Sequence, residues 1–383
     1  MIITDIEAFF IAEREDVTGP DPSHQAVVVR VTTDEGIRGF GESSSSPYLV
    51  KAAIEAPSFF AISRSMKELV VGRDPFDHAY IWEDLYRLTS YPGKRGVVIH
   101  AISALDIALW DIMGKAVGLP VYKLLGGAFR KRIPAYCSLV MPFDEAGVGT
   151  VVAAARDEGW HAIKLGWFPP RSSPAHDRAL VAAAREAAGD DVRLMLDVGP
   201  RWDLAADDQP AVQLWDVKTA IRAINDWSEY EPYWIEEPLP SDDVEGYRRL
   251  CGAVLPYIAA GEQEATRFPL FHLMDRGRID VVQFDVSRVG GLTEARRVVH
   301  AAQDRNRPFA PHCYSTGIVL AASAHLLAAA ANPMYLEFTT SDSPLLRELS
   351  SPALDVIDGE VCVPERPGLG IDIDEERLVA TGR

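Results

Sequence analysis

The sequence is poor in the features that mark secreted, disulfide-bonded or zinc-binding proteins. Only four cysteines occur, and their spacing fits neither a disulfide framework nor a zinc site. The first five residues lack the basic region and apolar core of a signal peptide. We therefore expect a cytoplasmic protein with reduced thiols. The cysteines are Cys137, Cys251, Cys313 and Cys362.

Positive charge and long apolar runs are also scarce. The chain has 38 Lys and Arg against 56 Asp and Glu, a net charge of -18, and no block of basic residues stands out. This balance argues against nucleic acid as a partner. The longest apolar stretch, Ile318 to Ala331, is interrupted by Ser323 and His325 and is too short to span a bilayer. We expect no membrane span.

What remains is an ordinary globular composition, with 48% hydrophobic and 25% charged residues. The 383 residues suit two or three domains. The first part reads as α+β, because strand-like runs at 2–11, 26–31 and 39–42 precede helical periodicity over 50–71, 75–89 and 96–117. Segments 13–24 and 43–47 read as loops, either on the surface or as lids over a site.

Beyond about residue 131 the pattern changes to short apolar runs separated by helical stretches. Polar markers at the ends of these runs are 28, 33, 39, 26, 23, 27 and 25 residues apart, which suits β-α units in series. The longest interval fits an extra loop at 201–216. Eight such units predict a parallel barrel. The runs are Ile133–Leu139, His161–Gly166, Val192–Val198, Tyr233–Glu237, Tyr257–Glu262, Val281–Val286, Phe309–His312 and Tyr335–Phe338.

Three acidic residues at the ends of consecutive runs indicate a metal site. Asp197, Glu236 and Glu262 can converge on one cation, since barrel chemistry gathers at the carboxyl ends of the strands. Oxygen ligands favour a hard ion, Mg²⁺ before Zn²⁺. Glu237 competes with Glu236, because adjacent strand residues point to opposite sides. The alternative for each residue is a salt bridge to an outer helix.

The next two runs end in Asp285 and His312. A carboxylate beside an imidazole fixes its tautomer and raises its basicity, which suits a general base. The alternative is a core histidine. Lys164 could bind a substrate carboxylate, act as a base if its pKa is lowered, or reach the surface. Glu337 could donate to an oxyanion if protonated, or organise its neighbours. Further candidates for pocket contacts are Tyr136, Trp167, Trp202 and His24.

These motifs resemble the mandelate racemase subgroup of the enolase superfamily over nearly the whole chain. In that pattern the first glutamate of the second metal motif is the ligand, which favours Glu236. Muconate-lactonizing relatives carry a lysine where this chain has Asp285, so the Asp285–His312 pair indicates the mandelate racemase subgroup. The matching segments are Ala104–Lys115, Leu124–Gly127, Trp234–Pro238, Gly261–Glu262, Arg288–Gly291 and Pro367–Ile371.

The resemblance implies a fold of class α/β. It consists of a (β/α)7β TIM-like barrel at 131–345 and an α+β capping domain formed by residues 1–130 and the returning segment 346–383. It also implies Mg²⁺ at Asp197, Glu236 and Glu262. His312 would be the base, Asp285 its orienter, Glu337 an enolate-stabilising donor and Lys164 an electrostatic assistant.

Two positions depart from the family pattern. The subgroup carries Lys-x-Lys on the second barrel strand, whereas this chain has Lys164-Leu165-Gly166 and so lacks the second base. Asn commonly follows the first metal ligand, and here Val198 stands after Asp197. With one base, we expect the proton α to a carboxylate to be removed and a sugar acid, an aldonate or aldarate, to be dehydrated to a 2-keto-3-deoxy acid.

Three alternatives to this function stay open. One is a racemase or epimerase with Lys164 as the second base, and another is a sugar-lactone cycloisomerase. From a different class, the chain could be a non-catalytic protein that binds a sugar acid or a metal. The resemblance also leads us to expect a homo-oligomer.

Overall fold

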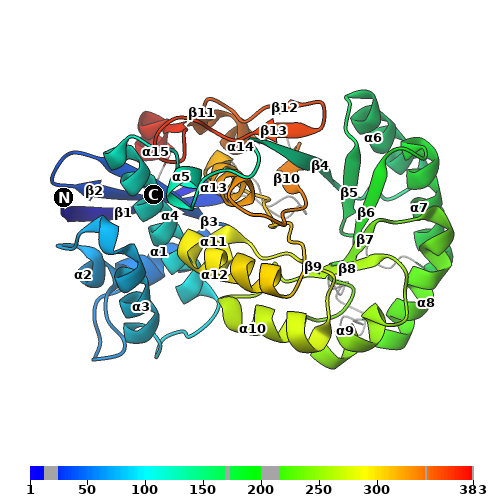
Figure 1. Ribbon diagram of the computed structural model, residues 1–383, viewed down its shortest axis with the longest axis horizontal. Helices are drawn as coiled ribbons and strands as arrows, with labels where there is room; N and C mark the ends of the chain where they lie inside the picture. Colours follow the sequence, from blue (N-terminus) through cyan, green and yellow to red (C-terminus); the bar gives the residue numbers. More distant parts are fainter. Residues whose placement is uncertain (13–24, 169–172, 200–214, 341–342, 382–383) are drawn as a thin grey trace.

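The computed structural model describes residues 1–12, 25–168, 173–199, 215–340 and 343–381. The proposed lid at 13–24 and nearly all of the extra loop at 201–216 lie outside these ranges, as do His24 and Trp202. Figure 1 shows a capping unit at one end, built around β1 to β3 and α1 to α4, and a barrel at the other.

The cap is built on a three-stranded antiparallel sheet in the order β1-β2-β3. Its alternate residues, such as Val27, Val29 and Val31, are buried under the cap helices. A turn follows β2, with the Gly36 amide donating to the Thr33 carbonyl at 3.0 Å. The strands are β1 (Ile3–Ala12), β2 (Gln25–Thr33) and β3 (Arg38–Ser43).

The long helix α4 is the centre of the cap. It packs so tightly on β3 that a Cβ at position 41 would lie 1.8 Å from the Ala104 carbonyl oxygen, so only glycine fits there. Among the described residues it is the one helix long and apolar enough to cross a membrane, and 94% of its apolar window is buried inside the protein. The helices are α1 (Pro47–Glu55), α2 (Met66–Val70), the 3-10 turn η2 (Pro75–Asp77), α3 (His78–Leu88), α4 (Val97–Val117) and α5 (Val121–Leu124).

The prediction of one helix over 50–71 was wrong. The structure divides this span into α1 and α2, joined by a segment in which Phe60 and Ser63 form a β-bridge. Ala56 is extended (φ -56°, ψ 132°) because the following Pro57 disfavours the helical conformation of the residue before it.

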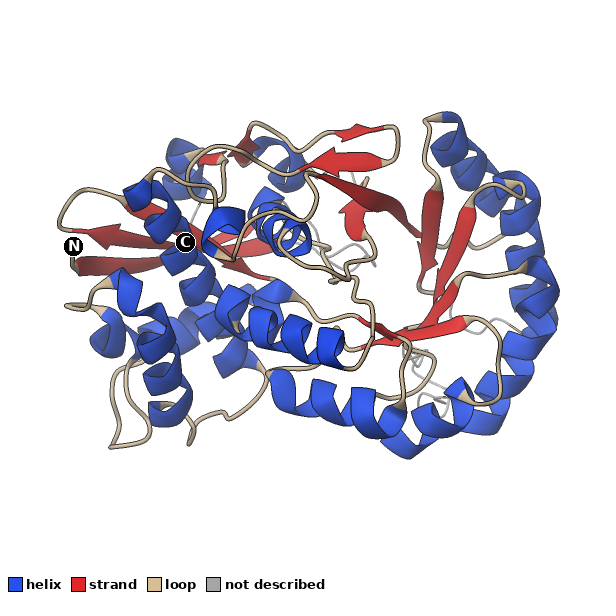
Figure 2. Ribbon diagram, in the orientation of Figure 1, coloured by secondary structure: helices blue, strands red, loops and turns tan. Residues whose placement is uncertain are grey.

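The barrel is a parallel sheet in the order β4-β5-β6-β7-β8-β9, and β10 pairs with β4. Its outer helices surround the sheet at the end of the molecule away from the cap, on the right in Figure 2. The strands are β4 (Arg132–Val140), β5 (Ala162–Gly166), β6 (Arg193–Asp197), β7 (Trp234–Glu236), β8 (Tyr257–Ala260), β9 (Val281–Val282) and β10 (Leu336–Thr339). The helices are α6 (Glu145–Asp157), α7 (Pro174–Ala188), α8 (Val217–Trp227), the 3-10 turn η3 (Ser228–Tyr230), α9 (Val244–Cys251), α10 (Arg267–His272), the π-turn η4 (Leu273–Gly277), α11 (Val286–Val289), α12 (Gly291–Asp304) and α13 (Gly317–Ala328).

The seventh expected strand, 309–312, is not a regular strand. It is joined to its neighbours only by isolated parallel bridges, among them Val282 with Phe309 and Asp285 with His312. Pro308 and Pro311 explain the irregularity, because proline has no N–H to donate to a ladder. The sixth strand is likewise shorter than expected and ends at Val282.

The C-terminal part of the chain contacts both units. Strand β13 pairs antiparallel with β4 of the barrel, whereas α15 packs on β1 of the cap. The segment 367–371 resembles a returning strand of the family in sequence, but here it is a loop, in which the Leu369 amide donates to Asp111 Oδ1 on α4 at 2.9 Å. The elements are α14 (Pro344–Glu348), β11 (Ser350–Ser351), β12 (Val356–Ile357), β13 (Glu360–Cys362), β14 (Asp372–Ile373) and α15 (Glu375–Thr381).

An apolar layer fills the barrel interior. Successive residues of a strand point alternately into the barrel and toward the outer helices. At each level, one inward-pointing residue from each strand therefore packs against those of the other strands. Within the layer, the rings of Tyr136 and Trp234 meet edge to face at 5.4 Å. The layer closes the barrel below the cavity described next. Its members are Tyr136, Ala162, Met195, Trp234, Ala259, Val281 and Ala310.

Candidate active site

A polar layer lies directly above the apolar one. Two residues further along each strand the side chain again points inward. The intervening residues, such as Ile163, Leu196 and Ile235, belong to the separate core shared with the outer helices. The layer holds Ser138, Lys164, Asp197, Glu236, Gly261, Gln283, His312 and Glu337.

Glu236, rather than Glu237, belongs to this layer. The Glu236 carboxylate accepts hydrogen bonds from Gln283 Nε2 at 2.9 Å and Trp234 Nε1 at 3.2 Å. Glu237 instead accepts from the Gly261 amide and from Gln263 Nε2, at 3.2 and 2.6 Å. The alternation along the strand therefore separates the two glutamates that the sequence left in competition.

Lys164 lies at the centre of the carboxylates and is only 2% exposed, so it does not reach the surface. Its Nζ is 2.9 Å from Glu236 Oε1, 2.8 Å from Glu337 Oε1 and 3.9 Å from Asp197 Oδ2. Burial opposes the charged form, but Glu236 and Glu337 outweigh it and hold the pKa of Lys164 well above its ordinary value. The interpretation of Lys164 as a base with a lowered pKa does not suit these surroundings.

Asp285 and His312 form the expected pair. His312 Nδ1 is 2.8 Å from Asp285 Oδ2, and Asp285 Oδ1 accepts from the amide and hydroxyl of Ser287, both at 2.6 Å. His312 Nε2 faces the cavity, 3.6 Å from Glu262 Oε2. Burial opposes protonation, but Glu262 and Glu337 raise the pKa of His312 to about 10. A neutral imidazole, which a base requires, is favoured once other positive charge engages these carboxylates.

Glu337 is held by three donors. It accepts from Ser138 Oγ at 2.8 Å and from the Cys313 amide at 2.7 Å, and it pairs with Lys164. Burial opposes ionisation, but the charges of Lys164 and His312 lower the pKa of Glu337 to about 2. These surroundings favour the second expectation for Glu337, that it organises its neighbours, over a protonated donor.

The residues expected to bind metal fit a hard divalent cation in donor type, and they lie at the carboxyl ends of consecutive strands. Asp197 and Glu236 end neighbouring strands and Glu262 follows the next one, and all three offer oxygen ligands. Burial and mutual repulsion raise the pKa of Asp197 well above its ordinary value, a conflict that a bound cation relieves. Within the described part of the chain, no three acidic, histidine or cysteine side chains lie close enough together to hold an ion, and the Glu236 carboxylate is turned toward Lys164 Nζ, 2.9 Å away.

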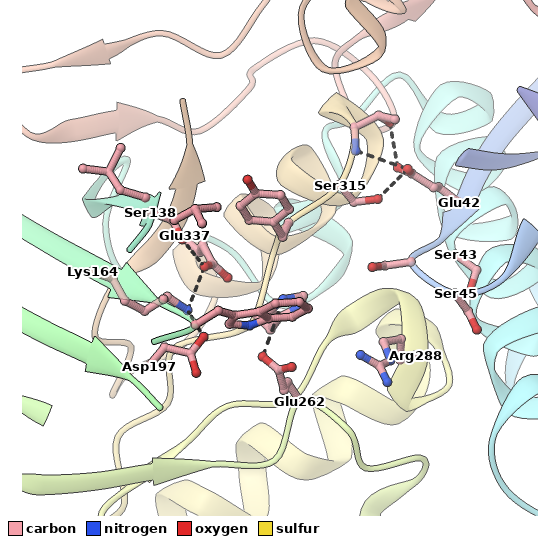
Figure 3. Close-up of a pocket in the computed structure, with 18 of the residues that line it drawn as sticks. Glu42, Ser43, Ser45, Ser138, Lys164, Asp197, Glu262, Arg288, Ser315 and Glu337 are labelled. Atoms are coloured by element: carbon pink, nitrogen blue, oxygen red, sulfur yellow. Dashed lines mark hydrogen bonds and ion pairs between the residues drawn. The ribbon is translucent and has the colours of Figure 1, made fainter. Parts of the chain in front are cut away.

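A cavity of about 340 Å³ opens above the polar layer, between barrel and cap. In Figure 3, Lys164, Asp197 and Glu337 lie on one side, Glu42, Ser43, Ser45 and Arg288 lie on the other, and Glu262 lies between them. Its volume is within the usual range for small-molecule sites. Its lining includes Gln25, Glu42, Ser43, Ser44, Ser45, Ser138, Lys164, Gly166, Trp167, Asp197, Glu262, Arg288, His312, Tyr314, Ser315, Thr316 and Glu337.

The serine segment of the cap is part of the cavity wall and is connected to the Asp285–His312 pair. Ser43 Oγ donates to the Ser287 carbonyl at 3.1 Å, and the Ser44 amide donates to Ser287 Oγ at 2.9 Å. Because Ser287 also holds Asp285, the cap supports the orientation of His312 through two intermediate residues, Ser287 and Asp285. Serines of segment 43–47 therefore line the site and are held in place by Ser287, so the segment is more than a surface loop.

Gly166 lines the cavity where the subgroup carries its second lysine. A Cβ at this position would lie 3.2 Å from Asp197 Oδ2. Of the other candidate contacts, Trp167 lines the cavity, whereas Tyr136 lies in the apolar layer with its ring 5.3 Å from Lys164 Nζ.

Sequence reasoning missed several residues of the site. Ser138 and Gln283 could have been found by counting two residues along each strand from the apolar layer. Ser287 follows Asp285, but nothing in its spacing marked it, and Arg288 stood out only as the start of a segment that resembles the family. Glu42 gave no signal, because its partners are more than 270 residues away in the chain.

Glu42 links the cap to the segment that follows His312. Its buried carboxylate accepts from Ser315 Oγ at 2.5 Å and from Thr316 N and Oγ1 at 3.2 and 2.6 Å. We expect Glu42→Ala to lower the free energy of unfolding in urea by about 2–3 kcal/mol, because it leaves buried donors without a charged acceptor. Glu42→Gln, which keeps one acceptor oxygen, should lose less than half as much. Equal losses in the two variants would contradict this reading.

Comparisons with known proteins agree with this architecture. Residues 148–377 match the family described as enolase C-terminal domain-like, and residues 19–126 match the mandelate racemase/muconate lactonizing enzyme N-terminal domain. The chain is 30% identical to D-galactarolactone cycloisomerase of Agrobacterium fabrum over 367 residues, 92% of this chain and 90% of the relative. It is 32% identical to D-galactonate dehydratase of Ralstonia nicotianae over 369 residues, 93% of this chain and 90% of the relative.

A solved structure with a bound metal matches over the full length. A racemase from Streptomyces coelicolor with bound magnesium superposes with a TM-score of 0.84 at 26% identity, covering 100% of both chains. The cap, the barrel and the layer of polar strand-end residues therefore occur together in a chain that matches both family domains. This chain belongs to the enolase superfamily of enzymes, in its mandelate racemase/muconate lactonizing enzyme subgroup.

Proposed function

We propose that this protein is a Mg²⁺-dependent sugar acid dehydratase that converts an aldonate or aldarate to a 2-keto-3-deoxy acid. The observation that carries the proposal is the pairing of one base with an adjacent carboxylate cluster. His312 Nε2 opens on the cavity 3.6 Å from Glu262, while Asp285 holds Nδ1 at 2.8 Å. The similarity to D-galactonate dehydratases over most of the chain supports it.

Asp197, Glu236 and Glu262 are the residues that would hold Mg²⁺. When bound, the ion supplies charge stabilisation for the substrate carboxylate as the α-proton leaves. Lys164 brings a second, fixed positive charge to the same end of the cavity. Glu337 keeps that ammonium in place, since its Oε1 lies 2.8 Å from Nζ.

His312 performs the proton transfers in this proposal. Its neutral Nε2 takes the proton from the α-carbon, and the electron pair of the broken C–H bond moves toward the carboxylate to give an enediolate. That pair then forms the double bond between the α- and β-carbons as the β-carbon–oxygen bond breaks, and His312 returns the proton to the departing hydroxyl, which leaves as water. The resulting enol tautomerises to the 2-keto-3-deoxy acid, so atoms and charge balance without another reactant.

The single base favours elimination over inversion. Racemisation by two bases needs a proton donor on the opposite face of the substrate, and the subgroup's lysine for that task is replaced by Gly166. Lys164 is fully engaged by Glu236 and Glu337. Among the described residues, His312 is therefore the base for one face of the α-carbon, and no free base faces the other.

The direct test is incubation with Mg²⁺ and a library of aldonic and aldaric acids, with 2-keto acid measured as its semicarbazone. We expect product from at least one acid, loss of product after chelation, and recovery when Mg²⁺ is restored. Absence of product from every acid, with Mg²⁺ binding confirmed by calorimetry, would count against dehydration.

A second candidate is a lactone cycloisomerase, because a relative with that activity is 30% identical over 92% of this chain. It too would use His312 for proton transfer. Sugar lactones in the same library distinguish the two reactions, since a cycloisomerase consumes the lactone without first releasing water. Racemisation or epimerisation would instead place solvent deuterium in unreacted substrate with inverted stereochemistry. A homo-oligomeric state and a cytoplasmic location remain predictions.

A further inference from the structure

Arg288 presents an unpaired guanidinium to the cavity. It lies on α11, three residues after Asp285, and lines the wall. Its side chain forms no hydrogen bond or ion pair with any residue that the structure describes, and its Nε is buried without a partner. Nearby arginines differ, since Arg267 and Arg297 both pair with Glu294, at 2.8 and 3.0 Å.

An unpaired guanidinium in a cavity wall indicates a missing anionic partner. A buried N–H without an acceptor is costly, and native proteins rarely leave one unsatisfied. Glu264 lies within electrostatic range of Arg288 but forms no ion pair with it. Asp285, its neighbour in the chain, is occupied by His312 and Ser287. No acid among the described residues therefore forms an ion pair with Arg288.

The surroundings of Arg288 are those of a polar binding site. Figure 3 places it on the same side of the cavity as Ser43 and Ser45, away from Lys164. Ser45 Oγ is 2.9 Å from His100 Nδ1, and His100 is only 7% exposed, so the hydroxyl is anchored from behind. Guanidinium with nearby hydroxyls is the donor set that recognises a carboxylate, because its planar fork donates two parallel hydrogen bonds.

We propose that Arg288 binds the distal carboxylate of the substrate, so that the preferred substrates are aldarates, sugar acids with a carboxylate at each end. The inference rests on the proposed function, which places the reacting carboxylate at the opposite end of the cavity, near Lys164 and Asp197. An aldonate would bring a neutral hydroxymethyl group to Arg288 and leave the guanidinium without a counter-charge.

The test uses matched acids that share their hydroxyl stereochemistry, galactarate with D-galactonate and D-glucarate with D-gluconate. In wild-type enzyme with Mg²⁺, we expect kcat/KM for the preferred diacid to exceed that of its monoacid by at least about tenfold. Arg288→Met should lower kcat/KM for the diacid by about 10–100-fold and change the monoacid by less than threefold. Arg288→Lys keeps the charge but loses the two parallel N–H donors of the guanidinium, so its kcat/KM for the diacid should lie between those of the wild type and Arg288→Met.

Binding to the His312→Asn variant provides a reading independent of turnover. Calorimetry with each acid should show that His312→Asn binds the diacid more tightly than the monoacid. The double variant His312→Asn/Arg288→Met should bind the two acids about equally. Arg249→Met, a change at an exposed arginine on α9, is the matched control and should alter neither quantity.

Two outcomes would overturn the inference. One is equal or better binding of the monoacids, and the other is a diacid preference that survives Arg288→Met. Failure of the proposed function looks different, because no acid would then give 2-keto acid while the binding preference persisted. Thermal unfolding of Arg288→Met serves as a check on folding, and we expect it unchanged because Arg288 makes no hydrogen bond within the described structure.

Discussion

The His312→Asn enzyme is expected to turn over its sugar acid about 10²–10⁴ times more slowly than the wild type, the usual contribution of a general base. Asparagine cannot accept the α-proton, and the other basic group near the cavity floor, Lys164, is held protonated between Glu236 and Glu337. The loss should fall on kcat more than on KM, since the imidazole acts on the substrate after it has bound.

The controls for this variant separate chemistry from structure. Calorimetry should show Mg²⁺ binding within a few-fold of wild type, because His312 is not one of the three oxygen ligands. His300→Asn, at an exposed histidine on α12, should leave the rate unchanged. Turnover of His312→Asn within tenfold of wild type would remove His312 from the role of base.

Lys164→Met is expected to lower the free energy of unfolding of the metal-free protein by about 3–5 kcal/mol, the usual cost of removing one partner of a buried ion pair. Methionine fills a similar volume, so the main change is electrostatic. Glu236 and Glu337, 0% and 1% exposed, would lose the ammonium that lies 2.9 and 2.8 Å from them. Urea unfolding in the presence of a chelator measures the loss.

A surface pair is the matched comparison. Lys131 and Glu365 lie 2.6 Å apart but are 61% and 57% exposed, so Lys131→Met should leave the unfolding midpoint nearly unchanged. Added Mg²⁺ should restore part of the stability of Lys164→Met, because a cation bound by the same carboxylates supplies replacement charge. A loss of less than about 1 kcal/mol for Lys164→Met would show that the buried carboxylates do not depend on this lysine.

The sequence predicted the barrel because a local pattern carries it. Each β-α unit repeats an apolar run and a polar strand end, and Asp197, Glu236, Asp285 and His312 all come to the predicted edge. Because side chains two residues apart on a strand point to the same side, the inward-pointing Trp234 also implies that Glu236, and not Glu237, points into the barrel. Periodicity of this kind depends only on neighbouring residues, which is why it can be read without a structure.

What the sequence could not supply depends on contacts between distant segments and on single prolines. Pro57 interrupts a helical pattern that hydrophobic spacing alone continues, and Pro311 prevents a regular seventh strand. The lack of a partner for Arg288 is a property of its three-dimensional surroundings, as is the contact of Glu42 with Thr316. Residues whose roles arise from packing across the cap–barrel boundary leave no local signal.

The ion pairs of α15 have a consequence for how the protein is made. Glu375, near the end of the chain, bonds Arg30 at 2.8 Å and Arg38 at 2.7 Å, and Arg30 precedes its partner by 345 residues. A nascent chain emerging from the ribosome therefore holds β2 and β3 without these partners until Glu375 has been synthesised. Closing so long a loop carries an entropic cost that the preassembled barrel reduces by bringing the ends together. The first turn of α15 thus pairs with a sheet whose strand β2 was synthesised 345 residues earlier.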